Sequence, residues 1–126
     1  MKKATKADIE IIKQAFIEKY SDAVTELNYK NDYELLIAII LSAQCTDKRV
    51  NIITPALFEK YPSVRELAVA ELGDVKALLN SCSFFNNKSK NIIKMAQSVL
   101  MEYDGEIPHD QKKLMKLAGV GNKTAN

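Results

Sequence analysis

The sequence contains no tryptophan, a single histidine, two cysteines, three prolines and four glycines among its 126 residues. Because glycine and proline punctuate turns and loops, their scarcity over long stretches indicates helices rather than a strand-and-turn protein. The net charge of +2 is close to neutral, so any basic surface has to be local. With 47% hydrophobic and 27% charged residues, the chain is typical of one globular domain with a core.

Cysteine and histidine, the residues of conventional zinc and cluster sites, are scarce. Cys45 and Cys82 lie far apart in hydrophobic surroundings, neither belongs to a CxxC pair, and His109 is the sole histidine. No conventional metal or cluster spacing can be built from them. We therefore expect no metal site, two cysteines in the core or in a pocket, and a surface position without a role for His109.

Long apolar runs are also missing. The longest, Leu35 to Leu41, has seven residues, whereas a membrane-spanning helix needs about 20. A polar stretch follows Met1-Lys2-Lys3, which is unlike a signal peptide. We expect a cytoplasmic protein with no membrane partner.

Apolar residues recur at helical spacing along most of the chain, so we expect an all-α fold of about eight short helices. Asp32 and Thr46 are candidate N-caps, and Pro55 predicts a kink or a restart near Thr54. The segment 33–44 is apolar nearly all round and should form the central core helix. The expected helices before the last turn cover about residues 5–20, 33–44, 47–61, 62–70, 75–80 and 88–103.

The last ten residues read LAGVGNKTAN, with Gly119 and Gly121 on either side of Val120. Glycine reaches positive φ easily and allows another backbone to approach closely, and a helix N-terminus suits a phosphate. The pattern predicts a helix, a tight hairpin anchored by Leu117 and Val120, and a second helix. A helix-to-helix turn that happens to use glycines is the alternative.

Three segments carry a resemblance to a known family. LAGVGNKTAN at 117–126 resembles LPGVGxKTAN, the helix-hairpin-helix of the endonuclease III family of DNA repair glycosylases. LLIAIILSAQCTD at 35–47 resembles that family's ELLIAxxLSAQxTD segment, and FFNNKSKNI at 84–92 is similar to the loop before its long middle helix. The resemblance covers essentially the entire chain and implies a helical bundle or barrel ending in a helix-hairpin-helix.

Lys123 gains a role from this resemblance. A helix N-terminus and a desolvated pocket both favour the neutral amine, which is the nucleophile. The family implies that this amine attacks the sugar carbon bearing a damaged pyrimidine, forms a Schiff base, and cleaves the strand by β-elimination. Two alternatives stay open: a non-catalytic helix-hairpin-helix DNA-binding module in which Lys123 contacts phosphate, and a helical interaction protein with no DNA role.

The resemblance also implies further DNA contacts. Gln44 would fill the gap left by a flipped nucleotide, and Phe84 would be an apolar wedge against the opposite strand. Phe84 and Phe85 could equally both be core anchors. Asp47 is expected to cap a helix and to line the pocket. The expected DNA-binding residues of the hairpin are Leu117, Gly119, Val120, Gly121 and Thr124.

Lysines cluster in two runs, one of Lys88, Lys90 and Lys94 and one of Lys112, Lys113 and Lys116. Each run is either a solvated helix face or a set of contacts to the DNA backbone. The expected partner is double-stranded DNA with a damaged base or an abasic site, bound by a monomer in the bacterial cytoplasm at the nucleoid.

The chain departs from the family in several places. Ala118 replaces the usual proline of the hairpin, and Ser83 stands where relatives often have glycine. The family's catalytic aspartate and its four [4Fe–4S] cysteines are not present, so the cluster is expected only in a full-length member. We therefore expect a truncated chain, inactive or impaired by itself, with residues 1–22 as a helix that packs on a missing domain and residues 23–126 as the helical domain.

Overall fold

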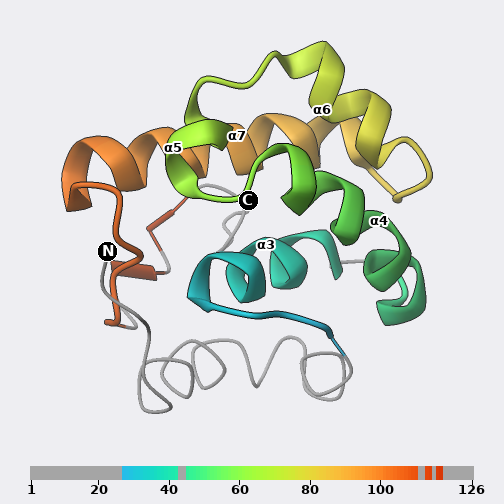
Figure 1. Ribbon diagram of the computed structural model, residues 1–126, viewed down its shortest axis with the longest axis horizontal. Coiled ribbons are helices and arrows are strands. Elements are labelled where there is room, and N and C mark those ends of the chain that lie inside the picture. Colours follow the sequence, from blue (N-terminus) through green and yellow to red (C-terminus); the bar gives the residue numbers. More distant parts are fainter. Residues whose placement is uncertain (1–26, 43–44, 111–112, 115, 118–126) are drawn as a thin grey trace.

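The computed structural model describes residues 27–42, 45–110, 113–114 and 116–117, and in these segments it contains helices and no strand. The all-α fold class is therefore confirmed. The expected helix at 5–20, and with it the boundary of the expected N-terminal region, lies outside the described residues. The labelled helices are α3 (Asp32–Ser42), α4 (Asp47–Lys60), α5 (Val64–Ala68), α6 (Leu72–Leu79) and α7 (Phe85–Tyr103) (Figure 1).

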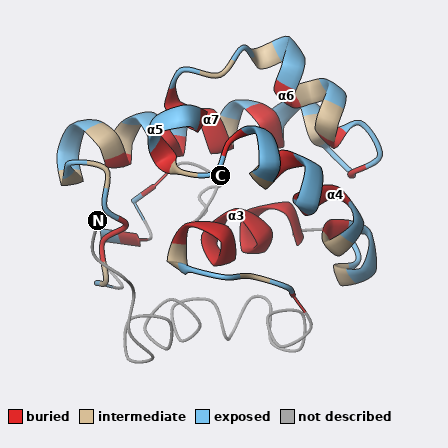
Figure 2. Cartoon of the chain, in the orientation of Figure 1, coloured by how far each residue is buried: buried red, intermediate tan, exposed pale blue. Residues whose placement is uncertain are grey.

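Helix α3 lies at the centre of the packing. Every residue from Tyr33 to Ser42 is buried, and the helix is red along its length in Figure 2. A helix that is apolar all round is stable only when other elements cover every side. The prediction of a central core helix is confirmed.

The N-cap of α3 is Asn31, one residue before the predicted Asp32. The side chain of Asn31, not that of Asp32, accepts a hydrogen bond from the Glu34 backbone N–H at 2.9 Å. The Glu34 carboxylate in turn accepts from the Lys30 backbone N–H at 3.0 Å. This pair resembles a capping box, in which an N-cap side chain reaches the third helical N–H and an acid reaches back.

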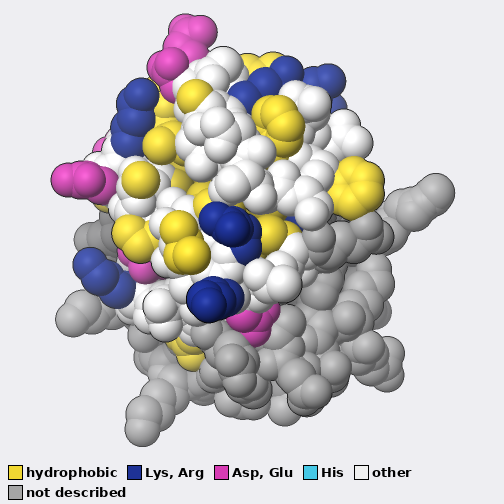
Figure 3. Space-filling model, turned by 90° about the vertical axis from the view of Figure 1, so that its right-hand side faces the viewer, with side chains coloured by type: hydrophobic (Ala, Val, Ile, Leu, Met, Phe, Trp, Pro, Cys, Tyr) yellow, Lys and Arg dark blue, Asp and Glu magenta, His cyan; other side chains and the backbone are white. Residues whose placement is uncertain are grey.

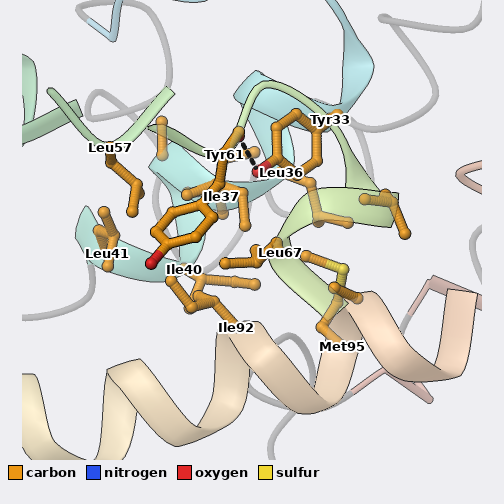
Figure 4. Packing of buried hydrophobic residues seen from close by; sticks show 14 of the residues in the cluster. Tyr33, Leu36, Ile37, Ile40, Leu41, Leu57, Tyr61, Leu67, Ile92 and Met95 are labelled. Atoms are coloured by element: carbon orange, nitrogen blue, oxygen red, sulfur yellow. Dashed lines mark hydrogen bonds between the residues drawn. The ribbon is translucent and has the colours of Figure 1, made fainter. Parts of the chain in front are cut away.

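Tyr33 ties the start of α3 to the end of α4. Its hydroxyl donates a 2.7 Å hydrogen bond to the carbonyl oxygen of Tyr61 (Figure 4). Its ring also packs against Phe58, with ring centroids 5.7 Å apart. Burial raises the pKa of the Tyr33 hydroxyl far above its usual value, which keeps it a donor.

Helix α7 supplies the opposite wall of the core. It packs against α3, α5 and α6, and Ile92 and Met95 point from it toward Ile40 and Leu67 (Figure 4). The helix begins at Phe85, three residues earlier than the sequence predicted. Its expected end is confirmed: Gly105 has φ +84° and donates its N–H to the Val99 carbonyl at 3.0 Å.

Two other helix boundaries differ from the sequence prediction. Helix α4 continues through Pro55 without a second start, and Pro55 itself is exposed. Gly73 belongs to α6 rather than preceding it. Gly73 lies in the first turn of α6. The backbone N–H groups of a first turn have no intrahelical partner whatever the residue, so a glycine there interrupts no helical hydrogen bond.

His109 has a structural contact, so the prediction that it has no role is wrong. Its Nε2 lies 2.8 Å from Oδ2 of Asp32, and both side chains are half-buried. This contact joins the segment after α7 to the first turn of α3.

Among the described residues, no helix is both long enough and apolar enough to cross a membrane.

Candidate functional site

The predicted site residues divide between the described and the undescribed parts of the chain. Phe84, Asp47 and Leu117 are described. The others lie outside the described residues, so their roles stay predictions: Gln44, Gly119, Val120, Gly121, Lys123 and Thr124.

The junction between α3 and α4 is held from both sides. At the end of α3, the Ser42 hydroxyl donates to the Ile39 carbonyl at 2.7 Å, and the Ser42 carbonyl accepts from the Cys45 N–H at 3.2 Å. At the start of α4, the Thr46 side chain accepts from the Arg49 N–H at 3.1 Å. The predicted Thr46 cap is confirmed. The expectation that Asp47 caps a helix is wrong, because Asp47 is the half-buried first residue of α4, and its role in lining a pocket stays a prediction.

Phe84 and Phe85 have opposite environments. Phe84 is 61% exposed, whereas Phe85 packs against the core. Phe84 is also the N-cap of α7 and has left-handed backbone angles, φ +58° and ψ +35°. That conformation costs about 1–2 kcal/mol in a residue other than glycine. The alternative in which both rings are core anchors is therefore wrong for Phe84, since its ring stands in solvent.

Lys88 is buried, which contradicts its assignment to a solvated or DNA-contacting face. It is only 6% exposed, and its Nζ donates to the Leu41 carbonyl at 2.9 Å and contacts the Cys82 Sγ at 3.5 Å. Lysine is rarely this deeply buried unless it is paired. Here the partner is a carbonyl in the last turn of α3, where the negative end of the helix dipole lies.

Cys82 lies beside Lys88, and the second cysteine, Cys45, lies just before α4. Cys82 is buried and Cys45 is half-buried, as the sequence predicted. Burial raises the pKa of the Cys82 thiol to about 11. A thiol with so high a pKa stays protonated and unreactive near neutral pH, and its Sγ donates to the Leu41 carbonyl at 3.6 Å.

The remaining described lysines of both runs are exposed, namely Lys90, Lys94, Lys113 and Lys116. Lys48 and Arg49, which belong to neither lysine run and were not predicted as site residues, are also exposed in the first turn of α4. Cations at this end of a helix oppose its dipole, so stability does not explain their placement. Their position directly after the SAQCTD segment was the signal that could have identified them.

Figure 3 shows the side of the molecule that lies to the right in Figure 1, where α3 ends and where α4 and α7 begin. On the described part of this side, hydrophobic side chains lie between those of Lys and Arg, and most Asp and Glu side chains lie toward its margin. Basic side chains can contact the phosphates of a nucleic acid duplex, and apolar side chains can contact its bases. This mixture of groups therefore suits a nucleic acid.

Leu117 is the last described residue, and its side chain lies in the core. Its side chain is 6% exposed and belongs to the main hydrophobic cluster, together with the fully buried Leu114. Its backbone N–H donates to the Leu114 carbonyl at 3.1 Å. The burial of Leu117 agrees with its expected place as an anchor in the core, and the predicted hairpin lies outside the described residues.

Comparison with known proteins agrees with this architecture. The model of the HhH-GPD superfamily of base excision DNA repair proteins matches residues 37–125. Endonuclease III of Synechocystis sp. is 46% identical over 107 residues, which are 85% of this chain and 49% of the relative. Endonuclease III of Escherichia coli strain K12 is 45% identical over 105 residues, 81% of this chain and 48% of the relative.

Solved structures show the same likeness. A trapped covalent intermediate of Endonuclease III with DNA superposes with a TM-score of 0.75 at 40% identity, covering 93% of this chain and 55% of that one. A thermostable thymine-DNA glycosylase, at 21% identity and a TM-score of 0.70, shares the fold.

The fold and the site together define an all-α domain with a buried central helix and an apolar and basic face around the ends of three helices. The chain belongs to the HhH-GPD superfamily of base excision DNA repair proteins, and its likeness to the endonuclease III family is confirmed. It spans about half the length of the curated relatives that it matches.

Proposed function

We propose that the protein carrying this chain removes oxidised pyrimidines from duplex DNA and cleaves the strand at the resulting abasic site. The observation that carries the proposal is the family match over residues 37–125, a range that includes Gln44, Phe84 and Lys123. A relative at 40% identity forms a covalent intermediate with DNA that can be trapped. A covalent enzyme–DNA step is the chemistry expected of an amine nucleophile.

Lys123 is the proposed nucleophile. Its neutral amine attacks C1′ of the damaged nucleotide, the bond from C1′ to the base breaks, and the base leaves with a proton. Ring opening then gives a Schiff base between the amine and C1′. Loss of a C2′ proton expels the 3′ phosphate by β-elimination, and water releases the lysine. The acid and base partners of these steps are not assigned to residues of this chain.

Phe84 is the proposed wedge. Its ring is 61% exposed and its backbone is left-handed. Both features are unfavourable for phenylalanine, which is normally buried and prefers negative φ. Strained residues of this kind concentrate at functional sites, and apolar side chains inserted at a base step are a common way to open a duplex. Gln44, in the segment between α3 and α4, is proposed to fill the gap on the flipped strand.

The exposed basic residues are proposed to hold the phosphate backbone. Lys113 and Lys116 precede the hairpin, and Lys48 and Arg49 follow the junction after α3. Contacts of this kind position a protein on DNA without reading its sequence. Each one lost should lower the salt dependence of binding by about one unit of slope.

A [4Fe–4S] cluster belongs to the proposal only for a longer form of the protein. The sequence holds two cysteines rather than four, and the described residues bring together no group of three or more His, Cys, Asp or Glu side chains. The cluster's ligands would have to come from residues that this sequence does not contain, and no step above uses the cluster.

Borohydride trapping on a duplex with one abasic site tests the nucleophile. The protein expressed from its complete reading frame should form a covalent adduct, and Lys123→Ala should abolish it. Lys123→Arg is the matched control, since it keeps the charge but cannot form a Schiff base. If Lys123→Arg cleaves as well as the unsubstituted protein, Lys123 only contacts phosphate and the chain is a non-catalytic DNA-binding module.

The same assay on the 126-residue chain by itself tests the proposal that this part is inactive or impaired. We expect weak binding and little trapping, because half of each curated relative has no counterpart here. Efficient trapping that Lys123→Ala abolishes would instead show that the residues of this chain suffice for the covalent step.

A further inference from the structure

Lys88 makes two connections, one through its side chain and one through its backbone. Through its side chain it reaches the end of α3, where Nζ donates to the Leu41 carbonyl at 2.9 Å. Through its backbone it reaches the start of α7, where its N–H donates to the Phe84 carbonyl at 3.0 Å. A single buried residue therefore joins the last turn of the central helix to the peptide of the exposed Phe84.

The bond from the Lys88 side chain to the Leu41 carbonyl is favoured by its surroundings at the end of α3. Helix α3 has no basic residue in its own last turn, so Lys88 supplies the positive group that the terminal carbonyls favour. Cys82 donates to the same Leu41 carbonyl at 3.6 Å and also contacts Nζ at 3.5 Å. The end of α3, the loop before α7 and the first turn of α7 thus meet at one buried point.

The backbone bond from Lys88 stabilises Phe84, whose own conformation is unfavourable. Phe84 has left-handed angles and no side-chain cap bond, so its conformation depends on contacts made by its backbone. The bond from Lys88 to its carbonyl closes the first turn of α7 and fixes that peptide. Leu41 and Lys88 are separated by 47 positions, and the side-chain bond converts that separation into a short link through the core.

We infer that Lys88 is a positioning residue that sets the Phe84 ring relative to the end of α3, so that the ring enters the duplex beside the extruded nucleotide. The inference rests on the proposed function, because it takes Phe84 to be the wedge. Lys88 is buried and does not touch DNA in this arrangement. Its effect on DNA binding passes through Phe84.

A double-mutant cycle tests the inference, because residues that act through one another have non-additive effects. The proteins compared are the unsubstituted protein, Phe84→Ala, Lys88→Met and the double variant. Each is titrated with a duplex that holds a tetrahydrofuran abasic analogue and with the same duplex undamaged, at one salt concentration. The measurement is the dissociation constant from fluorescence anisotropy.

We expect Phe84→Ala to weaken binding to the abasic duplex about tenfold, as the loss of one buried apolar side chain would. Lys88→Met should weaken it about fivefold, and the double variant should match Phe84→Ala within about twofold. Binding to the undamaged duplex should change less than about twofold in all three, since no wedge is inserted there.

Lys90→Met is the matched control. It removes the same charge two positions further along α7, from a side chain that is exposed. It should weaken binding to both duplexes by the same factor and lower the salt slope by about one. Lys88→Met should leave the salt slope unchanged. The slope therefore distinguishes a misplaced Phe84 ring from a lost phosphate contact.

A spectroscopic measurement adds a readout that lost stability does not move. With 2-aminopurine opposite the abasic site, insertion of Phe84 should unstack the base and raise its fluorescence at saturating protein. Lys88→Met should show a smaller rise at saturation. Lys88→Gln, which keeps an N–H donor on a shorter side chain, replaces Lys88→Met in every arm if the latter does not fold.

Two outcomes would overturn the inference. If the effects of Lys88→Met and Phe84→Ala multiply in the double variant, Lys88 does not act through Phe84. If Phe84→Ala binds the abasic duplex like the unsubstituted protein, Phe84 is not the wedge and Lys88 has nothing to position. Neither outcome affects Lys123-dependent borohydride trapping, so failure here is distinguishable from failure of the proposed activity.

Discussion

Phe84 and Phe85 are neighbours in the chain, yet Phe84 is 61% exposed and Phe85 packs against the hydrophobic core. The left-handed backbone of Phe84 produces the difference, because it turns the chain sharply at the point where α7 begins. One phenylalanine thus holds the start of the helix to the core, and the other presents its ring to solvent.

Substitutions at these two positions should have opposite effects on stability. Phe84→Gly should raise the free energy of unfolding by about 0.5–1 kcal/mol, because glycine adopts φ +58° without the steric cost that phenylalanine carries. Phe85→Ala should lower it by about 2 kcal/mol through lost packing. Urea unfolding followed by circular dichroism measures both, and a destabilised Phe84→Gly would contradict the assigned backbone conformation.

Tyr33→Phe should destabilise the fold by about 1–3 kcal/mol. The substitution keeps the ring packing but leaves the buried Tyr61 carbonyl without the hydroxyl that now donates to it at 2.7 Å. Thermal melts of Tyr33→Phe and of Tyr103→Phe, a control on a half-buried tyrosine of α7, make the comparison. Equal melting temperatures for the two variants would show that the bond contributes little.

Ser89→Ala should stabilise the protein by about 1 kcal/mol. Ser89 is fully buried, and its hydroxyl has no hydrogen-bond partner in the described part of the chain. An unsatisfied buried polar group costs about 1–3 kcal/mol, and alanine is also the better helix former. The urea midpoint should therefore rise with no change in slope. A lower midpoint would mean that the hydroxyl has a partner.

Cys82 should make stability depend on pH in the alkaline range. The folded pKa is about 11 and the ordinary value is 9.0, so between these values the unfolded state loses a proton that the folded state keeps. By linkage, the stabilisation is fully present below pH 9 and is lost as the pH rises toward 11.

The measurement is the difference in urea midpoint between the unsubstituted protein and Cys82→Ala at several pH values. The difference should shrink as the pH rises from about 8.5 to about 10.5, because the variant lacks the titrating thiol while all other groups are shared. Iodoacetamide at neutral pH should also react slowly with Cys82. A constant difference across this range would show that the Cys82 pKa is not raised.

Patterns within a few residues were sufficient for much of the fold. The continuous apolar segment before Gln44 predicts a helix covered on all sides, and the structure buries α3 accordingly. Thr46 and Gly105 mark a helix start and a helix end because the hydrogen bonds and backbone angles that they supply are local. The family resemblance likewise depends on short motifs that can be read directly.

Only the tertiary structure decided the environments of Lys88, Phe84 and His109. Lys88 has the same sequence surroundings as the exposed Lys90, but it is buried because its side chain meets a carbonyl of α3 from far along the chain. His109 likewise contacts Asp32, a residue far away in the chain, because the packing of the helices brings the two together. Helical periodicity specifies which residues share a face; which of those faces meets another helix end depends on how the helices pack.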